Sequence, residues 1–513
     1  MISEEKILII DFGSQYTQLI ARRIREAKVF SIIKPHSFSI DEIEKLNPNG
    51  IILSGGPQSV YADNAYSIDE KIFNLGIPIL GICYGLQLIC KLLDGKVEPA
   101  ENREYGKAIL KIEGENKLFL GVKESSSVWM SHGDLITQLP GNFINLAASD
   151  SSPNCAIANV ERNIYGVQFH PEVNHTEEGE KIIRNFLFEI CKCKGLWKSS
   201  NFIESSIVEI KNKIGSSKAI CALSGGVDST VAAVLMKKAI GDNLICVHID
   251  TGLMRKNESE EIENVFKEEL NLDVVFVNAE EIFIDRLEGV SNPEEKRKII
   301  GNTFIDLFES EAKKYSDLKF LVQGTLYPDV IESSPAAGTS ITIKTHHNVG
   351  GLPEKMNLKL IEPFRELFKD EVRNIGRELK IPEPFIERHP FPGPGLAVRV
   401  IGEITKERLE ILKEADDIFI TEIKNENLYL KIWQAFAVLL PVQTVGVMGD
   451  SRTYENVLAL RAITSTDGMT ADWFKFDSDF LSSVSNKIIN NVRGVNRVVY
   501  DISSKPPATI EWE

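Results

Sequence analysis

Short apolar segments alternate with helical patterns twice along this sequence, and this alternation constrains the fold more than any other feature. The first series covers residues 6–192, where runs such as Lys6–Phe12 and Ile77–Ile82 have the character of buried strands. The second series follows it, with strands expected at Lys218–Leu223 and Leu244–Asp250. Strands that alternate with helices form largely parallel sheets covered on both faces. The sequence therefore predicts an α/β protein with two doubly wound parallel-sheet domains.

The remainder of the chain has a mixed pattern. The run RHPFPGPG at 388–395 is too rich in Pro and Gly for a helix or a central strand. Beyond it, the pattern predicts helices near 405–424 and 479–492 and strands near 497–503 and 508–513. We therefore expect a smaller α+β domain after the two α/β domains, with the chain divided into residues 1–196, 197–388 and 389–513.

Composition narrows the class of protein. The chain has 513 residues, enough for about two to four domains. Its 58 basic and 74 acidic residues give a formal net charge of −16, which disfavours nucleic acid or an anionic membrane as its main partner. There is no leader pattern at the start, no apolar run of about 18 residues, and only seven cysteines. We expect a cytoplasmic protein that uses no membrane anchor and no disulfide framework.

One cysteine stands in a turn suited to a nucleophile. Gly81-Ile82-Cys83-Tyr84-Gly85 ends a predicted strand and opens a helix, and the two glycines permit the tight turn that exposes such a side chain. His170 is the candidate base, and Glu172 lies two residues on, which is the same side of an extended segment. Alone, Cys83 could be a structural cysteine and His170 a core histidine. Their shared position at strand ends of one doubly wound domain favours a catalytic site.

Residues 6–192 resemble a class I, or triad, glutamine amidotransferase domain. The motifs are GICYGLQ at 81–87 and QFHPE at 168–172. The resemblance implies that Cys83 forms a γ-glutamyl thioester with glutamine, that His170 serves as base and acid, and that Glu172 orients His170. It also implies a glutamine-holding role for Gln87 and for the segment Ser131-His132-Gly133-Asp134, in which Asp134 would suit the α-amino group of glutamine. From the residues alone, the amides of Gly55, Gly56 and Tyr84 are candidates for stabilising an oxyanion.

A phosphate-binding loop follows the first strand of the second series. Its residues are Ser224, Gly225, Gly226, Val227, Asp228 and Ser229. Glycines, hydroxyls and the amides of a helix start suit phosphate, and Asp228 suits Mg²⁺. The sequence has no Walker-type lysine loop, which favours attack at the α-phosphate of ATP with pyrophosphate leaving intact. The alternative is a plain glycine-rich turn. The motif resembles that of the ATP pyrophosphatase (PP-loop) family.

The whole chain resembles the family of glutamine-hydrolysing GMP synthases. The matching stretches are KTHHNVGG at 344–351, RHPFPGPG at 388–395 and KPPATIEWE at 505–513, together with the order of the two motifs above. The resemblance implies that XMP is adenylated by ATP and then aminated to GMP, with Mg²⁺ as cofactor. It also implies a homodimer formed through the third domain.

The same resemblance implies further site residues. Asp329 would join Asp228 near Mg²⁺. XMP and its phosphate would be held by Arg297, Lys344, Gln434, Arg497, Lys505, Ile510 and Glu511. Several of these residues have plainer interpretations: Lys505 and Glu511 could be surface charges, and Gln434 could serve packing within a helix.

Two other hypotheses stay open at this point. One keeps the amidotransferase chemistry but gives the ammonia to a different carbonyl or acid. Asparagine synthetase is the obvious case, but it needs a cysteine after Met1, and residue 2 here is Ile2. The other hypothesis is a non-catalytic nucleotide-binding protein, which predicts decay at Cys83 or at the phosphate loop. Both motifs are intact.

Overall fold

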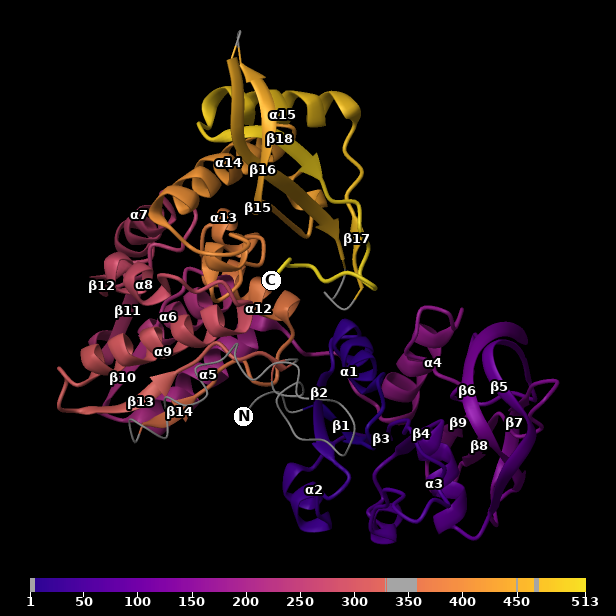
Figure 1. Ribbon diagram of the computed structural model, residues 1–513. Coiled ribbons are helices and arrows are strands. Elements are labelled where there is room, and N and C mark those ends of the chain that lie inside the picture. The colour runs from indigo at the N-terminus through magenta and orange to yellow at the C-terminus, as the bar shows by residue number, and fades with distance from the viewer. Residues whose placement is uncertain (1–4, 328, 330–357, 449–450, 466–469) are drawn as a thin grey trace. The chain divides into compact units, whose positions relative to one another are not determined.

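The computed structural model describes residues 5–327, 329, 358–448, 451–465 and 470–513. The chain divides into two compact units, with the boundary between Ser205 and Ser206. Figure 1 shows the sheets and helices of each unit. In the part of the chain just specified, no helix combines the length and the apolar character needed to cross a membrane.

The first unit is built on a nine-stranded sheet in the order β2-β1-β3-β4-β9-β8-β7-β5-β6. Its strands are β1 (Lys6–Asp11), β2 (Phe30–Pro35), β3 (Gly50–Leu53), β4 (Ile79–Ile82), β5 (Lys96–Ile112), β6 (Ser125–Gln138), β7 (Ile144–Ala148), β8 (Ala156–Asn159) and β9 (Ile164–Val167). In this spatial order, adjacent strands in the half β2-β1-β3-β4-β9 run parallel. Adjacent strands in the half β9-β8-β7-β5-β6 run antiparallel. The parallel half is the part that the apolar runs predict. The antiparallel half was not predicted. The prediction rests on continuous apolar runs, whereas β6 alternates buried and partly exposed residues and so contains no such run.

Helices cover this sheet. They are α1 (Thr17–Glu26), α2 (Ile40–Leu46), α3 (Tyr84–Leu92) and α4 (Gly179–Asn185), and α4 continues as a π-helical turn over Phe186–Ile190. Helix α2 begins at a capping box, in which the Ser39 hydroxyl accepts from the Glu42 amide and the Glu42 carboxylate accepts from the Ser39 amide. Leu8 and Ile9 point to opposite faces of β1 and are both fully buried. A strand covered on both faces must be apolar wherever it is buried, as β1 is from Ile7 to Ile10.

The second unit contains a five-stranded, wholly parallel sheet in the order β12-β11-β10-β13-β14. Its strands are β10 (Lys218–Ala222), β11 (Leu244–Asp250), β12 (Val274–Asn278), β13 (Leu318–Val322) and β14 (Lys359–Ile361). The associated helices are α6 (Val227–Ile240), α7 (Glu258–Asn264), α8 (Glu280–Leu287), α9 (Pro293–Ala312), α12 (Lys369–Glu378) and α13 (Glu383–Ile386), and α5 (Ser199–Ile214) precedes β10. The strand order reverses between β10 and β13. Open α/β sheets bind ligands beyond the carboxyl ends of strands at such a switch point.

The second unit also contains a four-stranded sheet in which β16 is central. Its strands are β15 (Gln434–Met448), β16 (Ser451–Thr464), β17 (Asp472–Trp473) and β18 (Val495–Tyr500), and helices α14 (Lys406–Asn425) and α15 (Ser478–Asn491) share its core. The orange pair β15 and β16 in Figure 1 is a long antiparallel hairpin. The sequence pattern did not predict this hairpin.

Two predictions in this region were wrong. Residues 508–513 form no strand. The guanidinium of the buried Arg461 donates to the carbonyls of Thr509 and Ile510, at 2.8 Å each, so these backbone groups are satisfied by a side chain instead of a neighbouring strand. Gln434 begins strand β15 and does not lie in a helix.

Candidate active sites

Cys83 lies on a sharp turn between β4 and α3. Its φ of 51° and ψ of −105° are uncommon for a residue with a side chain, and they aim the thiol away from the backbone. A Cβ at Gly81 would lie 2.6 Å from the Leu86 amide nitrogen, and a Cβ at Gly85 would lie 2.3 Å from the Leu53 carbonyl oxygen. Both glycines are therefore required sterically, as the sequence motif predicts.

His170 and Glu172 form a buried pair beside this cysteine. His170 Nδ1 lies 2.7 Å from Glu172 Oε1, and the two side chains are 4% and 0% exposed. Burial alone would lower the pKa of the His170 imidazole. The Glu172 carboxylate and the Cys83 thiol outweigh burial and raise that pKa well above its ordinary value. A protonated imidazole next to a thiol favours the thiolate, which is the nucleophilic form.

The glycine loop predicted to stabilise an oxyanion borders this site. A Cβ at Gly55 would lie 3.2 Å from His170 Cε1, and a Cβ at Gly56 would lie 2.9 Å from Tyr84 Cγ. Only glycines allow the loop backbone to come this close. The structure thus brings Gly55, Gly56, Tyr84 and His170 together, although they come from different segments of the chain.

The three residues expected to hold glutamine also lie at this site. The Cys83 thiol is 3.5 Å from the Ser131 carbonyl oxygen. The side-chain nitrogen of Gln87 donates to the Asp134 backbone carbonyl at 3.3 Å. This hydrogen bond helps to fix the position of the Ser131–Asp134 segment. Sequence reasoning gave no role to Gln168, whose amide nitrogen lies 3.7 Å from Cys83 Sγ. Its place two residues before His170 in an extended segment was the available signal.

The phosphate loop follows β10 at the switch point of the five-stranded sheet. Gly225 has a φ of 76°, and a Cβ there would lie 2.2 Å from Ile262 Cδ1, so glycine is required. The hydroxyls of Ser224 and Ser229 lie 3.1 Å apart on the exposed side of the loop. No side chain of the described residues caps the start of α6, so its first amides are available to bind an anion.

Asp228 is the residue of this loop best suited to a cation. Its Oδ1 atom is buried and has no hydrogen-bond partner among the described residues. Burial raises the pKa of this carboxyl, Lys369 opposes the rise, and Asp329 adds to it. A buried, unpartnered carboxylate oxygen with a second carboxylate nearby fits Mg²⁺, which uses one or two carboxylates together with phosphates and water. Within the described ranges, no three His, Cys, Asp or Glu side chains converge into a protein-only metal site.

Four of the residues expected to bind XMP lie in one neighbourhood. The Gln434 side chain donates to Glu511 Oε1 at 2.8 Å. The buried Arg399 donates to both oxygens of Glu511, at 3.1 and 2.9 Å. Ile510 packs against the apolar cluster of Phe436, Val438 and Ala459. Arg297 donates to the backbone oxygen of Glu513. Arg399 was not predicted from the sequence as a site residue. Its place in this neighbourhood follows only from its hydrogen bonds to Glu511 in the structure.

Of the other three, the structure places Arg497 away from this neighbourhood. Arg497 pairs with Val457 on β16, whereas Gln434 pairs with Ile463 on the same strand. Six positions along a strand correspond to about 20 Å. Lys505 is tied through its backbone to Ala471, with hydrogen bonds of 2.8 and 3.1 Å. Lys344 lies outside the described residues.

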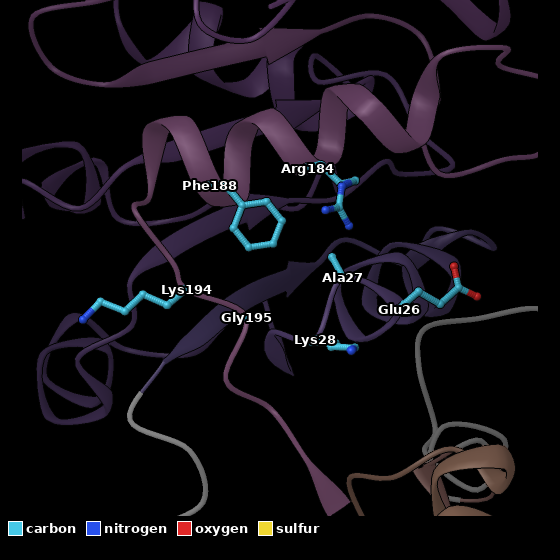
Figure 2. Close-up of a pocket in the computed structure, with 7 residues that line it drawn as sticks. All are labelled: Glu26, Ala27, Lys28, Arg184, Phe188, Lys194 and Gly195. Atoms are coloured by element: carbon cyan, nitrogen blue, oxygen red, sulfur yellow. The ribbon is translucent and has the colours of Figure 1, made fainter.

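The first unit also contains a cavity of about 450 Å³. Figure 2 shows Arg184 and Phe188 directed from the α4 segment towards Ala27, while the Lys194 side chain points away. No residue of the Cys83 site lines it, so it supplies no part of the chemistry described above.

Comparisons with known proteins assign three consecutive stretches of the chain to known families. Three family models match: "Glutamine amidotransferase class-I" at residues 8–190, "NAD synthase" at 198–301 and "GMP synthase C terminal domain" at 421–512. A solved structure from Thermoplasma acidophilum, described as one subunit of a GMP synthase, is 32% identical with a TM-score of 0.34. That match covers 39% of this chain and 98% of the solved one.

Two curated relatives match over nearly the full length. Both are described as "GMP synthase [glutamine-hydrolyzing]". The protein from Brachyspira hyodysenteriae is 57% identical over 509 residues, and the protein from Aquifex aeolicus is 59% identical over 507 residues. Each match covers 99% of both chains. This chain therefore belongs to the family of glutamine-hydrolysing GMP synthases.

Proposed function

We propose that this chain makes GMP from XMP, with glutamine as nitrogen source and ATP as activating substrate. The observation that carries the proposal is the presence of two sites in one chain: a thiol at a strained strand-to-helix turn, and a lysine-free phosphate loop at a sheet switch point. Full-length identity of 57% and 59% to glutamine-hydrolysing GMP synthases supports the same reaction.

The first site hydrolyses glutamine. The Cys83 thiolate attacks the side-chain amide carbon, and the resulting oxyanion faces the amides of Gly55, Gly56 and Tyr84. His170, oriented by Glu172, gives its proton to the departing nitrogen, and ammonia leaves with the thioester still on Cys83. His170 then takes a proton from water as that water attacks the thioester. Glutamate leaves and the thiolate is restored.

The second site activates XMP. The oxygen on C2 of the xanthine ring attacks the α-phosphorus of ATP, and pyrophosphate leaves. Ammonia then adds at C2, and AMP departs with that oxygen. The hydroxyls of Ser224 and Ser229 and the first amides of α6 are suited to the pyrophosphate portion of ATP. Asp228 and Asp329 would hold Mg²⁺, which would neutralise phosphate charge there.

We assign XMP binding to the neighbourhood of Gln434, Glu511 and Arg297, with Ile510 as an apolar wall. Arg497, Lys505 and Lys344 stay predictions. We also keep the division into residues 1–196, 197–388 and 389–513 as a proposal. The ranges matched by the three family models support its order.

A direct assay tests the acceptor. The protein is incubated with ATP, Mg²⁺ and glutamine, and pyrophosphate is measured with XMP or with IMP. We expect pyrophosphate release and GMP formation only with XMP, because IMP has no oxygen on C2 to be adenylated. Pyrophosphate release that is equal with XMP, with IMP and with neither monophosphate added to the ATP would refute the acceptor assignment.

A homodimer formed through the third domain is part of the proposal. Val445, Val447 and Tyr454 are 48%, 74% and 64% exposed on the β15–β16 hairpin, and Val445 pairs with Tyr454. A Cβ at Gly446 would lie 2.7 Å from Asn496, so the opposite face of the hairpin is covered. An exposed apolar face supports association between copies. Sedimentation equilibrium should give twice the chain mass, and a monomer at micromolar concentration would contradict this.

A reducing, cytoplasmic location also belongs to the proposal. All seven cysteines are free and buried, which supports a compartment that keeps thiols reduced. Fractionation of the source cells tests it, and recovery outside the cytosol would contradict it.

A further inference from the structure

A line of hydrogen-bonded buried groups reaches the sulfur of Cys83 independently of the triad. Gln168 Nε2 lies 3.7 Å from Cys83 Sγ. Gln168 Oε1 accepts from Gln87 Nε2 at 3.3 Å, and the same Gln87 nitrogen donates to the Asp134 carbonyl at 3.3 Å. Neither His170 nor Glu172 takes part in these bonds.

The line continues to a second histidine–carboxylate pair. His132 Nδ1 lies 3.0 Å from the same Asp134 carbonyl oxygen, and His132 Nε2 lies 3.1 Å from Glu104 Oε2. The Ser149 hydroxyl donates to Glu104 Oε1 at 3.2 Å. Gln87 thus donates to a backbone carbonyl in the segment that borders Cys83, and the His132 ring lies against the same carbonyl oxygen.

The orientation of every amide in this line follows from the Asp134 carbonyl. A carbonyl oxygen only accepts, so Gln87 must present its NH₂ group to it. The second N–H of Gln87 then meets the oxygen of Gln168, which leaves the NH₂ group of Gln168 facing the sulfur. Gln168 and Gln87 are 1% and 4% exposed, so water does not compete for these bonds.

We propose that Gln168 is a further catalytic residue of the glutaminase: its side-chain N–H stabilises the Cys83 thiolate, and Gln87 aims it. A hydrogen bond to the charged form of a group favours that form, and bonds to ionised acceptors are the stronger kind. His132 and Glu104 act through the Asp134 carbonyl and are positioning residues. The inference rests on the proposed glutaminase function of Cys83.

Alkylation of Cys83 tests the role of Gln168 without ATP or XMP. The rate of reaction with iodoacetamide is followed against pH, and the Cys83→Ala protein gives the background from the other thiols. In Gln168→Leu, which removes the donor at similar volume, we expect half-maximal alkylation at higher pH. Both the alkylation rate at neutral pH and the turnover of glutamine should fall about tenfold. Gln168→Glu, which has the same shape, should be slower still because it adds a negative charge beside the sulfur.

The same substitution at an exposed position supplies the control. Gln138→Leu, at the exposed end of β6, should alkylate and hydrolyse glutamine like the wild type. If both Gln168 variants lost turnover but kept the wild-type alkylation profile, Gln168 would serve packing only and the inference would fail. Unchanged turnover in Gln168→Glu would equally overturn it. Because the readout requires no XMP, its failure is distinguishable from failure of GMP synthesis.

Discussion

We expect replacement of Cys83 with alanine to abolish GMP synthesis from glutamine and to leave synthesis from ammonium salts. The thiol is the proposed nucleophile on the turn between β4 and α3, and alanine has no group that could attack glutamine. We expect loss of glutamine-dependent turnover by about four orders of magnitude or more. Free ammonia should bypass this step, since the residues proposed to activate XMP all lie in the second unit. Initial rates of AMP formation with each nitrogen donor measure both quantities.

Cys90→Ala is the matched control for this variant. Cys90 lies on α3, the helix that begins directly after Cys83, and its side chain is fully buried. Burial raises the pKa of its thiol to about 12, so the thiol stays neutral and unreactive. Its removal should leave both nitrogen donors usable. If Cys83→Ala instead lost both activities while remaining folded, glutamine hydrolysis and XMP activation would not be separable steps in this chain.

We expect Asp228→Asn to impair XMP activation strongly with either nitrogen donor. The change keeps the shape of the side chain and removes the charge that would hold Mg²⁺ against the phosphates of ATP. We expect pyrophosphate release to fall by about a factor of 100 to 1,000. Oδ1 of Asp228 is buried without a hydrogen-bond partner among the described residues, so the loss of charge relieves a desolvated group. The thermal midpoint should therefore be unchanged or higher, which separates a catalytic from a folding defect.

The control lies just beyond the other end of the same helix. Asp242 is fully exposed and pairs with Lys237 at 2.9 Å. Asp242→Asn should change pyrophosphate release and stability little, because exposed ion pairs contribute little. Wild-type pyrophosphate release by Asp228→Asn across a range of Mg²⁺ concentrations would disprove the assignment of Asp228 as a cation ligand.

The residues around Cys83 could be predicted because each lies in a short local motif. The tight turn needs its two glycines next to the cysteine, and His170 and Glu172 are two positions apart on one extended segment. Gln168 and Glu104 were given no role, and His132 was named only as part of the segment expected to hold glutamine, because their contacts depend on how β5, β6 and the end of β9 come together. Such long-range pairing leaves little trace in a single sequence.

The same limit explains the third region of the chain. Apolar runs predicted the parallel strands, because a strand buried on both faces is apolar throughout. The segment 508–513 also looked like a strand, but buried Arg461 binds its carbonyls. Resemblance supplied Gln434 and Glu511 as separate residues, and only the structure shows that Gln434 donates directly to Glu511 and that Arg399 is a second donor to the same carboxylate.

The most direct test of the central claim follows the oxygen on C2 of XMP. XMP labelled with ¹⁸O at that position is converted to GMP with ATP and ammonium, and the products are analysed by mass spectrometry. If this oxygen attacks the α-phosphorus and leaves with AMP, as we propose, the label should appear in the phosphate of AMP. Label in orthophosphate together with ADP, or label lost to water with unlabelled AMP, would contradict adenylation of XMP by this chain.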